Sequence, residues 1–382
     1  MKIAIVNWPI NDVGGINTYC ENLIKGLRNL DHDPHLYHLT PQGKYAEATH
    51  GGAVTPATKR RFTILPGVHL SYADTTCASC TDDYLNKYDL VIFLHPGPHP
   101  TKAVKANKYH LNWMRIYKEL KVPNLVIFHD ANWRKTNAWF EDVSDCVDAA
   151  LAAQHIFLPS VVDYPSVGPK KWEYFPLDID AFDKYSKFKS RQPFGILATQ
   201  WLKWKNHHKF LPHMPDIRIP MRVFGAGMEY HNLAKQQVFN DAFCCDFTRE
   251  DLPDGVLSNN VPHEYYGYVD YEQLMMNMGE ALFSIDLSTK GYTNMTHWEP
   301  MACYTLNLVH EDTLANEYCR IPEDCCFTFN WDNVVDVINE LHPQESHVVE
   351  TVDNAYTFVS DRCHCTYVVD RILKWLEEED TI

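Results

Sequence analysis

The chain has 382 residues, enough for two domains of ordinary size. Lysine and arginine total 34 against 50 aspartate and glutamate residues, and the resulting net charge of −16 argues against a protein that simply coats nucleic acid. No stretch approaches the roughly 18 apolar residues of a membrane span, and residues 1–8 lack the features of a signal peptide. We therefore expect a cytoplasmic protein with no membrane partner.

The first residues predict the beginning of a doubly wound α/β domain. Residues 2–7 have the continuous apolar pattern of a buried parallel strand. A loop with Gly14 and Gly15 follows, and from Thr18 the apolar residues recur with helical spacing. Residues 33–39 predict the next strand, which completes the opening of such a domain. The glycine pair allows a ligand to approach the backbone closely at the start of a helix.

Two more strands are predicted in the first half, at residues 89–94 and 124–128, with a helix over residues 101–120 between them. His129 and Asp130 come directly after the second of these strands. Ligands bind at the carboxyl ends of strands in open parallel sheets, so this pair is a candidate for catalysis. The alternative is a pair that only ties down a loop.

The second half repeats the α/β pattern. Residues 154–160 predict one more strand of the first half, and residues 176–193 show no clear apolar period, so we expect them to link two domains. Further strands are predicted at residues 194–198, 222–225, 263–269 and 282–285, and helices at residues 271–281 and 352–378. The expected division is an N-terminal domain over residues 1–180, a C-terminal domain over residues 192–355, and a C-terminal helix, 356–382, that crosses back to the first domain.

Candidate ligand-binding residues follow the predicted strands of the second half. Lys203 and Lys205 lie in the loop after residues 194–198, where an anion could bind, and Gly225 ends the next strand. This placement favours a site for a charged ligand at the edge of the second sheet.

Residues 291–309 bring polar groups together ahead of a buried strand. Thr296, His297 and Glu299 precede a short predicted helix and an apolar run. A glutamate near the start of a helix faces the positive end of the helix dipole and could accept hydrogen bonds from vicinal hydroxyls, as on a ribose. The alternative is that Glu299 only caps the helix and His297 packs inside.

Residues 98–137 depart from the acidic balance of the chain, with eight basic residues against two acidic ones and aromatic residues between them. One interpretation is a solvated helix face. The other is a surface that follows phosphates and stacks aromatic rings on bases. The candidate residues are Lys102, Lys105, Lys108, Arg115, Trp133, Arg134 and Lys135.

The twelve cysteines are expected to be mostly reduced in a cytoplasmic protein. Cys77 and Cys80 could form a zinc site with Cys363 and Cys365, but a second C-x-x-C is missing. Buried free thiols are the favoured interpretation, and no metal is implied.

The pattern as a whole resembles the GT-B retaining glycosyltransferases of the large family-4 type. Residues 13–39 resemble that family's glycine loop, first helix and second strand, residues 265–282 its strand and following helix, and residues 299–303 its Glu-Ala-Met-Ala-Cys segment. The resemblance implies two Rossmann-like domains that face a central cleft, and a UDP-sugar as co-substrate rather than a bound cofactor. The donor-binding residues that it implies are Gly14, Gly15, Lys203, Lys205, Gly225, Tyr266, Thr296, His297 and Glu299.

Three positions depart from the pattern of this family. Tyr304 stands where the family has glycine, Gly291 where it has a first glutamate, and Gln200 where it has an arginine that binds the pyrophosphate. Lys203 is a candidate replacement for that missing charge.

A narrower resemblance is to the DNA α-glucosyltransferases of T-even phages. It is carried by Trp204-Lys205, residues 263–267, Thr296-His297-x-Glu299 and His129-Asp130. It implies a hydroxylated pyrimidine such as 5-hydroxymethylcytosine, in double-stranded DNA of a phage-infected bacterium, as acceptor, and such an enzyme must flip its target base. His129 would bind the donor sugar or the acceptor hydroxyl, with Asp130 as orienting group or base.

Two alternatives remain open at this point. A glycan or lipid acceptor fits the negative net charge better. A non-catalytic GT-B-like binding protein would account for Gly291 and Gln200.

Overall fold

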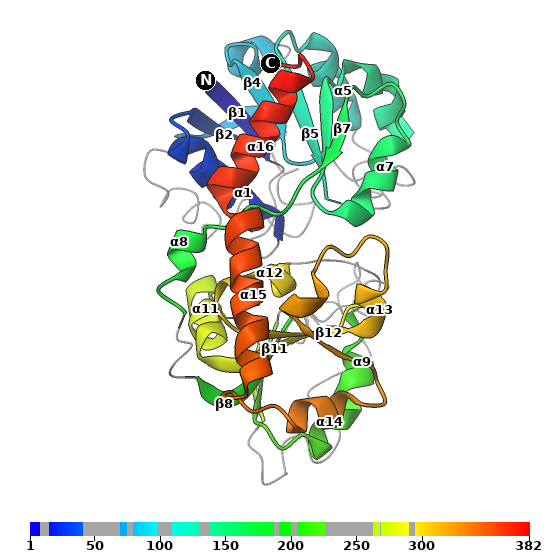
Figure 1. The fold of residues 1–382 in the computed structure, drawn as a ribbon. Helices are drawn as coiled ribbons and strands as arrows, with labels where there is room; N and C mark the ends of the chain where they lie inside the picture. The colour runs from blue at the N-terminus through cyan, green and yellow to red at the C-terminus, as the bar shows by residue number, and fades with distance from the viewer. Residues whose placement is uncertain are drawn as a thin grey trace. The chain divides into compact units, whose positions relative to one another are not determined.

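The protein is described here from a computed structural model. The structure describes residues 1–7, 15–40, 69–74, 79–97, 109–129, 138–186, 191–199, 205–225, 263–267, 269–289 and 295–382. The chain forms two compact units, which Figure 1 shows in ribbon form. Unit 1 comprises residues 1–178 and 362–382, and unit 2 comprises residues 179–361.

Unit 1 is built on a sheet of seven parallel strands in the order β3-β2-β1-β4-β5-β6-β7. Its strands are β1 (Lys2–Asn7), β2 (Asp33–Thr40), β3 (His69–Asp74), β4 (Leu90–Phe93), β5 (Asn124–Phe128), β6 (Ala149–Ala152) and β7 (Lys170–Trp172). Strands β4, β5 and β6 are buried along their whole length, as expected for a parallel sheet covered on both faces. The chain steps outward from β1 to β3 and then returns to place β4 on the other side of β1.

The helices of unit 1 connect these strands. They are α1 (Gly15–Asn29), η1 (Thr81–Leu85), α5 (Tyr109–Glu119), η2 (Ala138–Cys146), η3 (His155–Phe157), α7 (Leu158–Val162) and α16 (Cys365–Glu378). Among the helices of the described residues, none is both long and apolar enough to span a bilayer.

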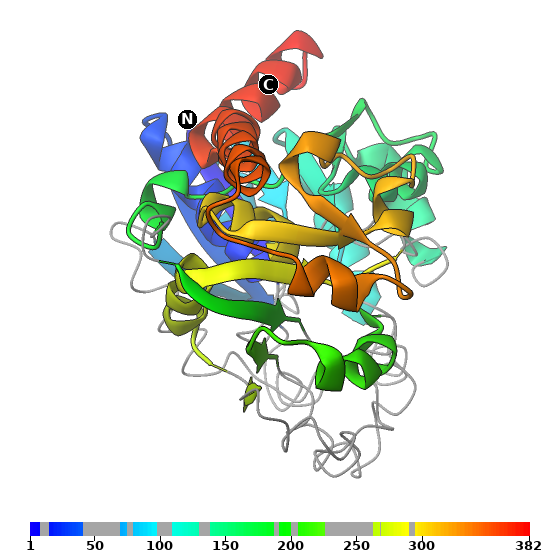
Figure 2. The same cartoon turned by 60° about the horizontal axis from the view of Figure 1, so that its bottom comes forward.

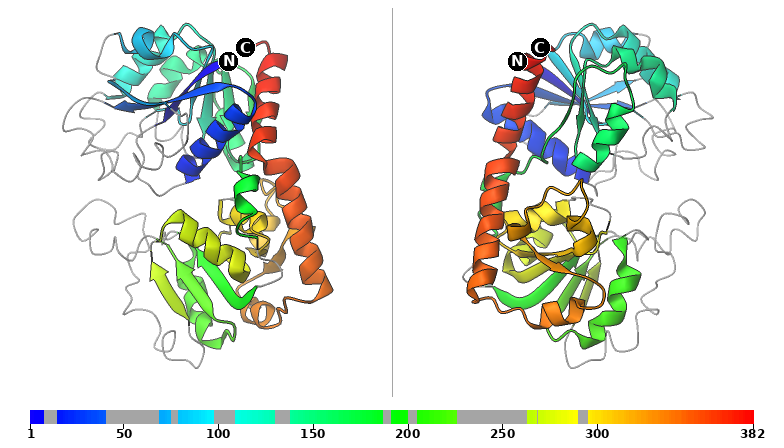
Figure 3. Two further views of the ribbon diagram at one scale, coloured as in Figure 1. Left: turned by 90° about the vertical axis from the view of Figure 1, so that its left-hand side faces the viewer. Right: turned by 45° about the vertical axis from the view of Figure 1, so that its right-hand side comes forward.

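Helix α16 comes last in the sequence but packs on α1, and the two helices lie side by side in both views of Figure 3. Gly26 permits this contact, because a Cβ atom there would lie 2.5 Å from the Cys365 carbonyl oxygen. The side chain of Asn29 donates a hydrogen bond to Thr366 Oγ1 at 2.9 Å. The end of unit 1's first segment is held at the start of α16. Leu177 N donates to the carbonyl oxygen of Cys363, two residues before that helix, at 2.6 Å, and Cys365 N donates to Leu177 O at 2.7 Å.

Unit 2 repeats the architecture with six parallel strands in the order β10-β9-β8-β11-β12-β13 (Figure 2). The strands are β8 (Gln192–Ala198), β9 (Met221–Phe224), β10 (Glu264–Gly267), β11 (Ala281–Asp286), β12 (Leu306–His310) and β13 (Phe327–Phe329). The helices are α8 (Ile179–Phe182), α9 (His207–Phe210), η6 (Leu211–Asp216), α11 (Tyr271–Glu280), α12 (Met295–Ala302), α13 (Glu311–Leu314), η7 (Glu323–Cys325), α14 (Val334–Asn339) and α15 (Ser346–Cys363).

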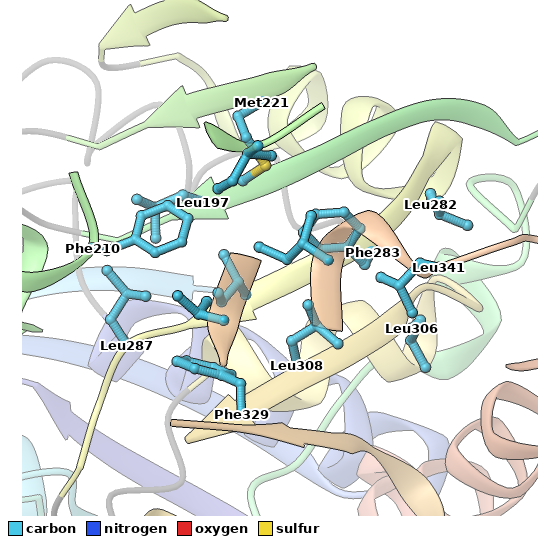
Figure 4. Close-up of a cluster of buried hydrophobic side chains, with 14 of the residues drawn as sticks. Leu197, Phe210, Met221, Leu282, Phe283, Leu287, Leu306, Leu308, Phe329 and Leu341 are labelled. Carbon is cyan, nitrogen blue, oxygen red and sulfur yellow. The ribbon is translucent and has the colours of Figure 1, made fainter. Parts of the chain in front are cut away.

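The core of unit 2 lies on the central strands of this sheet. Figure 4 shows Leu197 of β8, Phe283 of β11 and Leu308 of β12 together with Phe210 of α9 and Met221 of β9. Gly195 in β8 leaves the space that the Phe283 ring fills, because a Cβ atom at this position would lie 2.1 Å from Phe283 Cζ. Any larger residue at position 195 would therefore force the two central strands to shift.

Most of the predicted strands are confirmed, and residues 2–7 and 124–128 have the predicted bounds. The strand predicted at residues 154–160 is wrong. This segment forms η3 and then α7, with Pro159 in the first turn of the helix, and the strand of this region is β6. Part of the predicted linker, residues 176–193, forms α8, where Ile179 and Phe182 are buried.

Candidate functional site

The candidate site of unit 2 lies where the order of its strands reverses. Strands β8 and β11 are neighbours, but the chain leaves β8 toward β9 and leaves β11 toward β12. Loops that diverge in this way leave a crevice at the carboxyl ends of the two strands, where α/β proteins bind ligands. Lys205 follows β8 and Asp286 ends β11, so both residues belong to this edge.

Five residues form a polar group at this edge, which we call the Lys205 cluster: the buried Lys205, Asp286, Ser288 and His297, and the half-buried Thr296. Asp286 accepts hydrogen bonds from the Ser288 backbone N–H at 2.8 Å and from the Thr296 hydroxyl. Nε2 of His297 lies 3.6 Å from Asp286 Oδ1. Lys205 Nζ donates to Ser288 Oγ at 3.3 Å. The cluster thus joins the ends of two strands to the first turn of α12.

Lys205 and Asp286 favour each other's charged forms. Burial lowers the pKa of Lys205, and the neighbouring Asp286 carboxylate opposes that shift. Burial alone would raise the pKa of Asp286, but His297, Lys205 and the hydrogen bonds from Ser288 and Thr296 hold it well below its usual range. Asp286 is therefore a carboxylate at neutral pH, although its side chain is fully buried.

Neighbouring side chains fix the loops that carry the cluster. Asn206 has a φ of 57°, in the left-handed region that asparagine tolerates, and its Nδ2 donates to the Leu287 carbonyl at 2.8 Å. The hydroxyl of Thr313 donates to the Ser288 carbonyl oxygen. These bonds tie the segment after β8 to the segment after β11, so Lys205 and Ser288 are held by backbone as well as by side chains.

Glu299 lies in the middle of α12 rather than at its start. The helix begins at Met295, so the expected position near the positive end of the dipole is wrong, and so is the capping alternative. The Glu299 side chain is nearly buried, and its Oε1 accepts a hydrogen bond from the Tyr271 hydroxyl at 2.7 Å. His297 is fully buried, as the packing alternative predicted, yet it contacts Asp286. Tyr271 thus fixes Glu299 from the neighbouring helix α11.

Gly225 directly follows β9 and Tyr266 lies on β10, and these two strands are neighbours at one edge of the sheet. Gly225 follows β9 with a φ of 143°, which favours glycine. Tyr266 is 37% exposed, stacks on Phe224 with ring centroids 4.9 Å apart, and donates its hydroxyl hydrogen bond to Glu264 at 2.6 Å. Within the described residues, its contacts are on the outer strands rather than with the Lys205 cluster.

In unit 1, His129 directly follows β5. Its Nε2 atom is buried and has no hydrogen-bond partner among the described residues. Burial lowers the pKa of His129 to about 3, so the imidazole is neutral at physiological pH. The ring meets Tyr19 of α1 edge to face, with centroids 4.9 Å apart. Gly15 is the first residue of that helix.

Several predicted residues lie outside the described residues: Gly14, Lys102, Lys105, Lys108, Asp130, Trp133, Arg134, Lys135, Gln200, Lys203 and Gly291. Of the candidate residues in the basic stretch 98–137, the structure describes Arg115, whose guanidinium lies 3.8 Å from the Glu119 carboxylate in α5. Two further basic residues of the stretch, Lys118 and Lys121, are also described, and Lys121 Nζ lies 2.9 Å from Asp82 Oδ1. The DNA-binding role of this stretch stays a prediction.

Neither the cysteines considered for a zinc site nor the cavity beside β13 belongs to the Lys205 cluster. Cys80, Cys363 and Cys365 are buried, and burial raises the pKa of Cys365 to about 11. No cluster of three or more potential metal ligands occurs in the described part of the chain. A cavity of about 750 Å³ borders β13, α14 and the start of α15 and contains none of the candidate residues.

Four residues of this region escaped the sequence analysis: Asp286, Ser288, Asn206 and Tyr271. Asp286 directly follows the predicted strand 282–285, so the criterion that selected His129 after its strand would also have selected it. Asn206 and Tyr271 act through contacts with residues far along the chain, and their local sequence gives no sign of this.

Known structures share this architecture over the whole chain. No protein-family model matches the sequence, and no curated protein matches it in sequence. An α-glucosyltransferase in complex with UDP-glucose and DNA containing an abasic site has a TM-score of 0.71 at 12% identity, over 99% of each chain. The fold is GT-B.

Two other solved structures that resemble this chain belong to proteins whose names differ from that of the α-glucosyltransferase. HepE of Anabaena in complex with UDP has a TM-score of 0.68 at 12% identity, over 99% of this chain and 100% of that one. Sucrose-phosphate synthase from Thermosynechococcus elongatus has a TM-score of 0.65 at 12% identity, over 99% of this chain and 98% of that one. The GT-B fold therefore includes all of unit 1 and unit 2, and the function must be argued from the site.

Proposed function

We propose that the protein is a retaining glycosyltransferase that moves a sugar from a UDP-sugar to a hydroxylated pyrimidine, such as 5-hydroxymethylcytosine, in double-stranded phage DNA. The observation that carries this proposal is the Lys205 cluster, which places a buried lysine at the strand reversal of a GT-B C-terminal unit. The reaction would take place in the cytoplasm of a phage-infected bacterium.

The donor would bind to unit 2. When the bond between the sugar and the diphosphate breaks, negative charge develops on the leaving diphosphate, and the Lys205 ammonium would stabilise it. Lys203 is a second candidate for this role. Glu299, held by Tyr271, would accept hydrogen bonds from the ribose hydroxyls. Because Tyr271 fixes the carboxylate before the donor arrives, little ordering of Glu299 is needed on binding.

The acceptor would bind to unit 1. His129 is neutral at physiological pH, so it would act as a hydrogen-bonding group toward the sugar or the acceptor hydroxyl rather than as a cation. Asp130 would orient it or accept the proton of the hydroxyl. Two observations support DNA as the acceptor. One is the basic stretch 98–137. The other is the similar structure of an α-glucosyltransferase with UDP and DNA that contains an HMU base.

The test supplies each UDP-sugar in turn with duplex DNA that does or does not contain 5-hydroxymethylcytosine. We expect one sugar mass to be added to the modified nucleoside and none to unmodified DNA. Lys205→Met should lower the transfer rate by roughly 10²- to 10³-fold, the usual effect of removing one group that stabilises transition-state charge. Lys209→Met is the matched control, because Lys209 is an exposed lysine of the same region.

The outcome distinguishes the candidate functions. An α-linked product from an α-linked donor would support retention of configuration. Absence of transfer to any modified DNA would refute the DNA acceptor. If Lys205→Met and Glu299→Gln variants kept the full in vitro function, the protein would be a GT-B-like binding protein rather than an enzyme.

A second candidate is a transferase with a glycan or lipid acceptor, which the net charge of −16 favours. Binding to DNA releases counterions and weakens as salt rises, whereas binding to an uncharged glycan does not. Retention of the protein on immobilised DNA at low salt, lost as salt rises, is expected for the first candidate. No retention at low salt would favour the second.

A further inference from the structure

Asp286 has no role in the reaction described above, although it holds the centre of the Lys205 cluster. Its carboxylate accepts hydrogen bonds from Ser288 N and the Thr296 hydroxyl and lies next to His297. Ser288 follows β11, and Thr296 and His297 belong to α12, whereas Lys205 follows β8. A single buried carboxylate therefore connects the segment after β11 and the first turn of α12, and it binds the backbone of Ser288, whose hydroxyl accepts the hydrogen bond from Lys205 Nζ.

The titratable groups that face Asp286 from the surrounding described elements are Lys205 before α9, His207 in α9, and His297 in α12. His207 is neutral at physiological pH, because burial lowers its pKa to about 3. Burial lowers the pKa of Lys205 and so disfavours its charged form. The Asp286 carboxylate, unlike the neutral His207, favours the charged form of Lys205.

Moving an isolated carboxylate from water into a protein interior is strongly unfavourable, so a buried carboxylate needs interactions that stabilise its charge. Here the cost is offset by two hydrogen bonds and by the neighbouring cation. The same carboxylate has a second effect. It opposes the desolvation of Lys205, so the lysine stays protonated in an environment where a lone lysine would tend to lose its proton.

We propose that Asp286 is a positioning residue, whose carboxylate fixes Lys205 and the first turn of α12 as one preassembled site for the diphosphate and keeps the Lys205 ammonium charged. This inference rests on the proposed function, in which Lys205 binds the diphosphate. It predicts that an acidic residue strengthens the binding of an anion, the opposite of what the charge of Asp286 alone would do.

The decisive variant is Asp286→Asn, which keeps the size of the side chain and removes its charge. In this variant Lys205 loses its proton at lower pH than in the wild type. Once the pH exceeds the pKa of Lys205, each further unit lowers the charged fraction, and with it the diphosphate contribution to UDP affinity, about tenfold. Uridine has no diphosphate, so its affinity should be the same in the variant and the wild type.

The first measurement uses the ligand-free protein. Lysine labelled with ¹³C at Cε reports the titration of each lysine by NMR, and the Lys205→Met variant identifies the Lys205 signal. We expect the Lys205 titration to move to lower pH in Asp286→Asn and to stay unchanged in Asp312→Asn. Asp312 is a matched control because it is an exposed carboxylate beside His310 of the adjacent strand. An unchanged or higher titration midpoint in Asp286→Asn would overturn the proposal.

The second measurement is calorimetric titration with UDP and with uridine at two pH values, one below and one above the Lys205 midpoint that the NMR titration of Asp286→Asn gives. For Asp286→Asn we expect weaker UDP binding at the higher pH, recovery at the lower pH, and unchanged uridine binding. UDP binding equal to or tighter than that of the wild type at both pH values would overturn the proposal.

Two provisions keep the test decisive. If Asp286→Asn does not fold, Ser288→Ala removes the acceptor of Lys205 Nζ and leaves the carboxylate in place. Losing this acceptor should move the Lys205 titration to lower pH but leave Lys205 protonated at pH 7, because the Asp286 carboxylate remains. A midpoint below pH 7 in Ser288→Ala would show that Ser288 rather than Asp286 keeps Lys205 charged and would overturn the proposal. If the wild-type protein binds no UDP, the proposed function fails, whereas the NMR titration still decides whether Asp286 keeps Lys205 charged.

Discussion

Tyr304 offers a test of the local structure that ends α12. The residue has a φ of 57°, in the left-handed region where the resembled family has glycine. Thr305 N donates to Pro300 O at 2.9 Å and Tyr304 N donates to Met301 O at 3.2 Å. These two bonds form a Schellman motif, in which the left-handed residue usually has no Cβ atom.

The perturbation is a pair of substitutions, Tyr304→Gly and Tyr304→Ala. Both remove the stack of Tyr304 on Tyr356, whose ring centroids are 4.0 Å apart, and such a stack contributes about 0.5–1.5 kcal/mol. They differ in backbone strain, because a left-handed conformation costs a residue with a Cβ atom about 1–2 kcal/mol. Part of this advantage of glycine is lost, because glycine gives up more conformational entropy on folding than alanine, at a cost of about 0.5–1 kcal/mol. We therefore expect the glycine variant to be more stable than the alanine variant by roughly 1 kcal/mol.

Urea denaturation of the two variants, followed through the transition of unit 2, measures this difference. The control pair is Glu350→Gly and Glu350→Ala, at an exposed position inside α15, where the order should be reversed because alanine favours an ordinary helix. If Tyr304→Ala equals or exceeds Tyr304→Gly in stability, the argument from backbone strain is refuted.

Two further predictions follow from the sites. Tyr271→Phe removes the hydrogen bond to Glu299 and should raise the KM for the UDP-sugar by about 10- to 150-fold, the effect of losing a bond to a charged group, while kcat changes little. Steady-state kinetics would contradict this if kcat fell and KM did not. Because the pKa of His129 is about 3 in the folded protein and about 6.5 in an unfolded chain, folding stability should fall as the pH drops from about 6.5 toward 3, by at most about 1.4 kcal/mol per unit from this residue. His129→Leu should show a shallower dependence in urea denaturation at several pH values, and an unchanged slope would argue against a neutral buried imidazole.

The parts of the fold that the sequence predicts well are the long buried strands. Residues 2–7 and 124–128 are continuous apolar runs with polar residues at their ends, and a parallel strand is the simplest structure for them. Residues 154–160 contain the short apolar run 156–158, but such a run fits one turn of helix equally well, and Pro159 is tolerated in the first turn of α7. The true strand, β6, is a run of small residues with little strand preference.

The candidate site shows a similar limit. Lys205, Thr296 and His297 were selected because they follow strands or precede an apolar run, and the structure brings these three together. The residue that joins them, Asp286, lies 81 positions from Lys205, and periodicity within a short window cannot report a contact over that separation. The helix start at Met295 was also missed, although Asn294, which directly precedes it in the sequence, is a residue type that favours the N-cap position.

The packing of α16 on α1 affects the order in which the two units can fold during translation. Unit 2 is one uninterrupted segment, residues 179–361, whereas unit 1 needs residues from both sides of it. During synthesis on the ribosome, unit 2 can acquire all of its strands while α1 still lacks the helix that covers Gly26. The nascent chain therefore carries an exposed face on α1 for the whole time that unit 2 is translated, and this interval is when aggregation or chaperone binding is expected. Substitutions in α16 should accordingly reduce the yield of folded protein in cells.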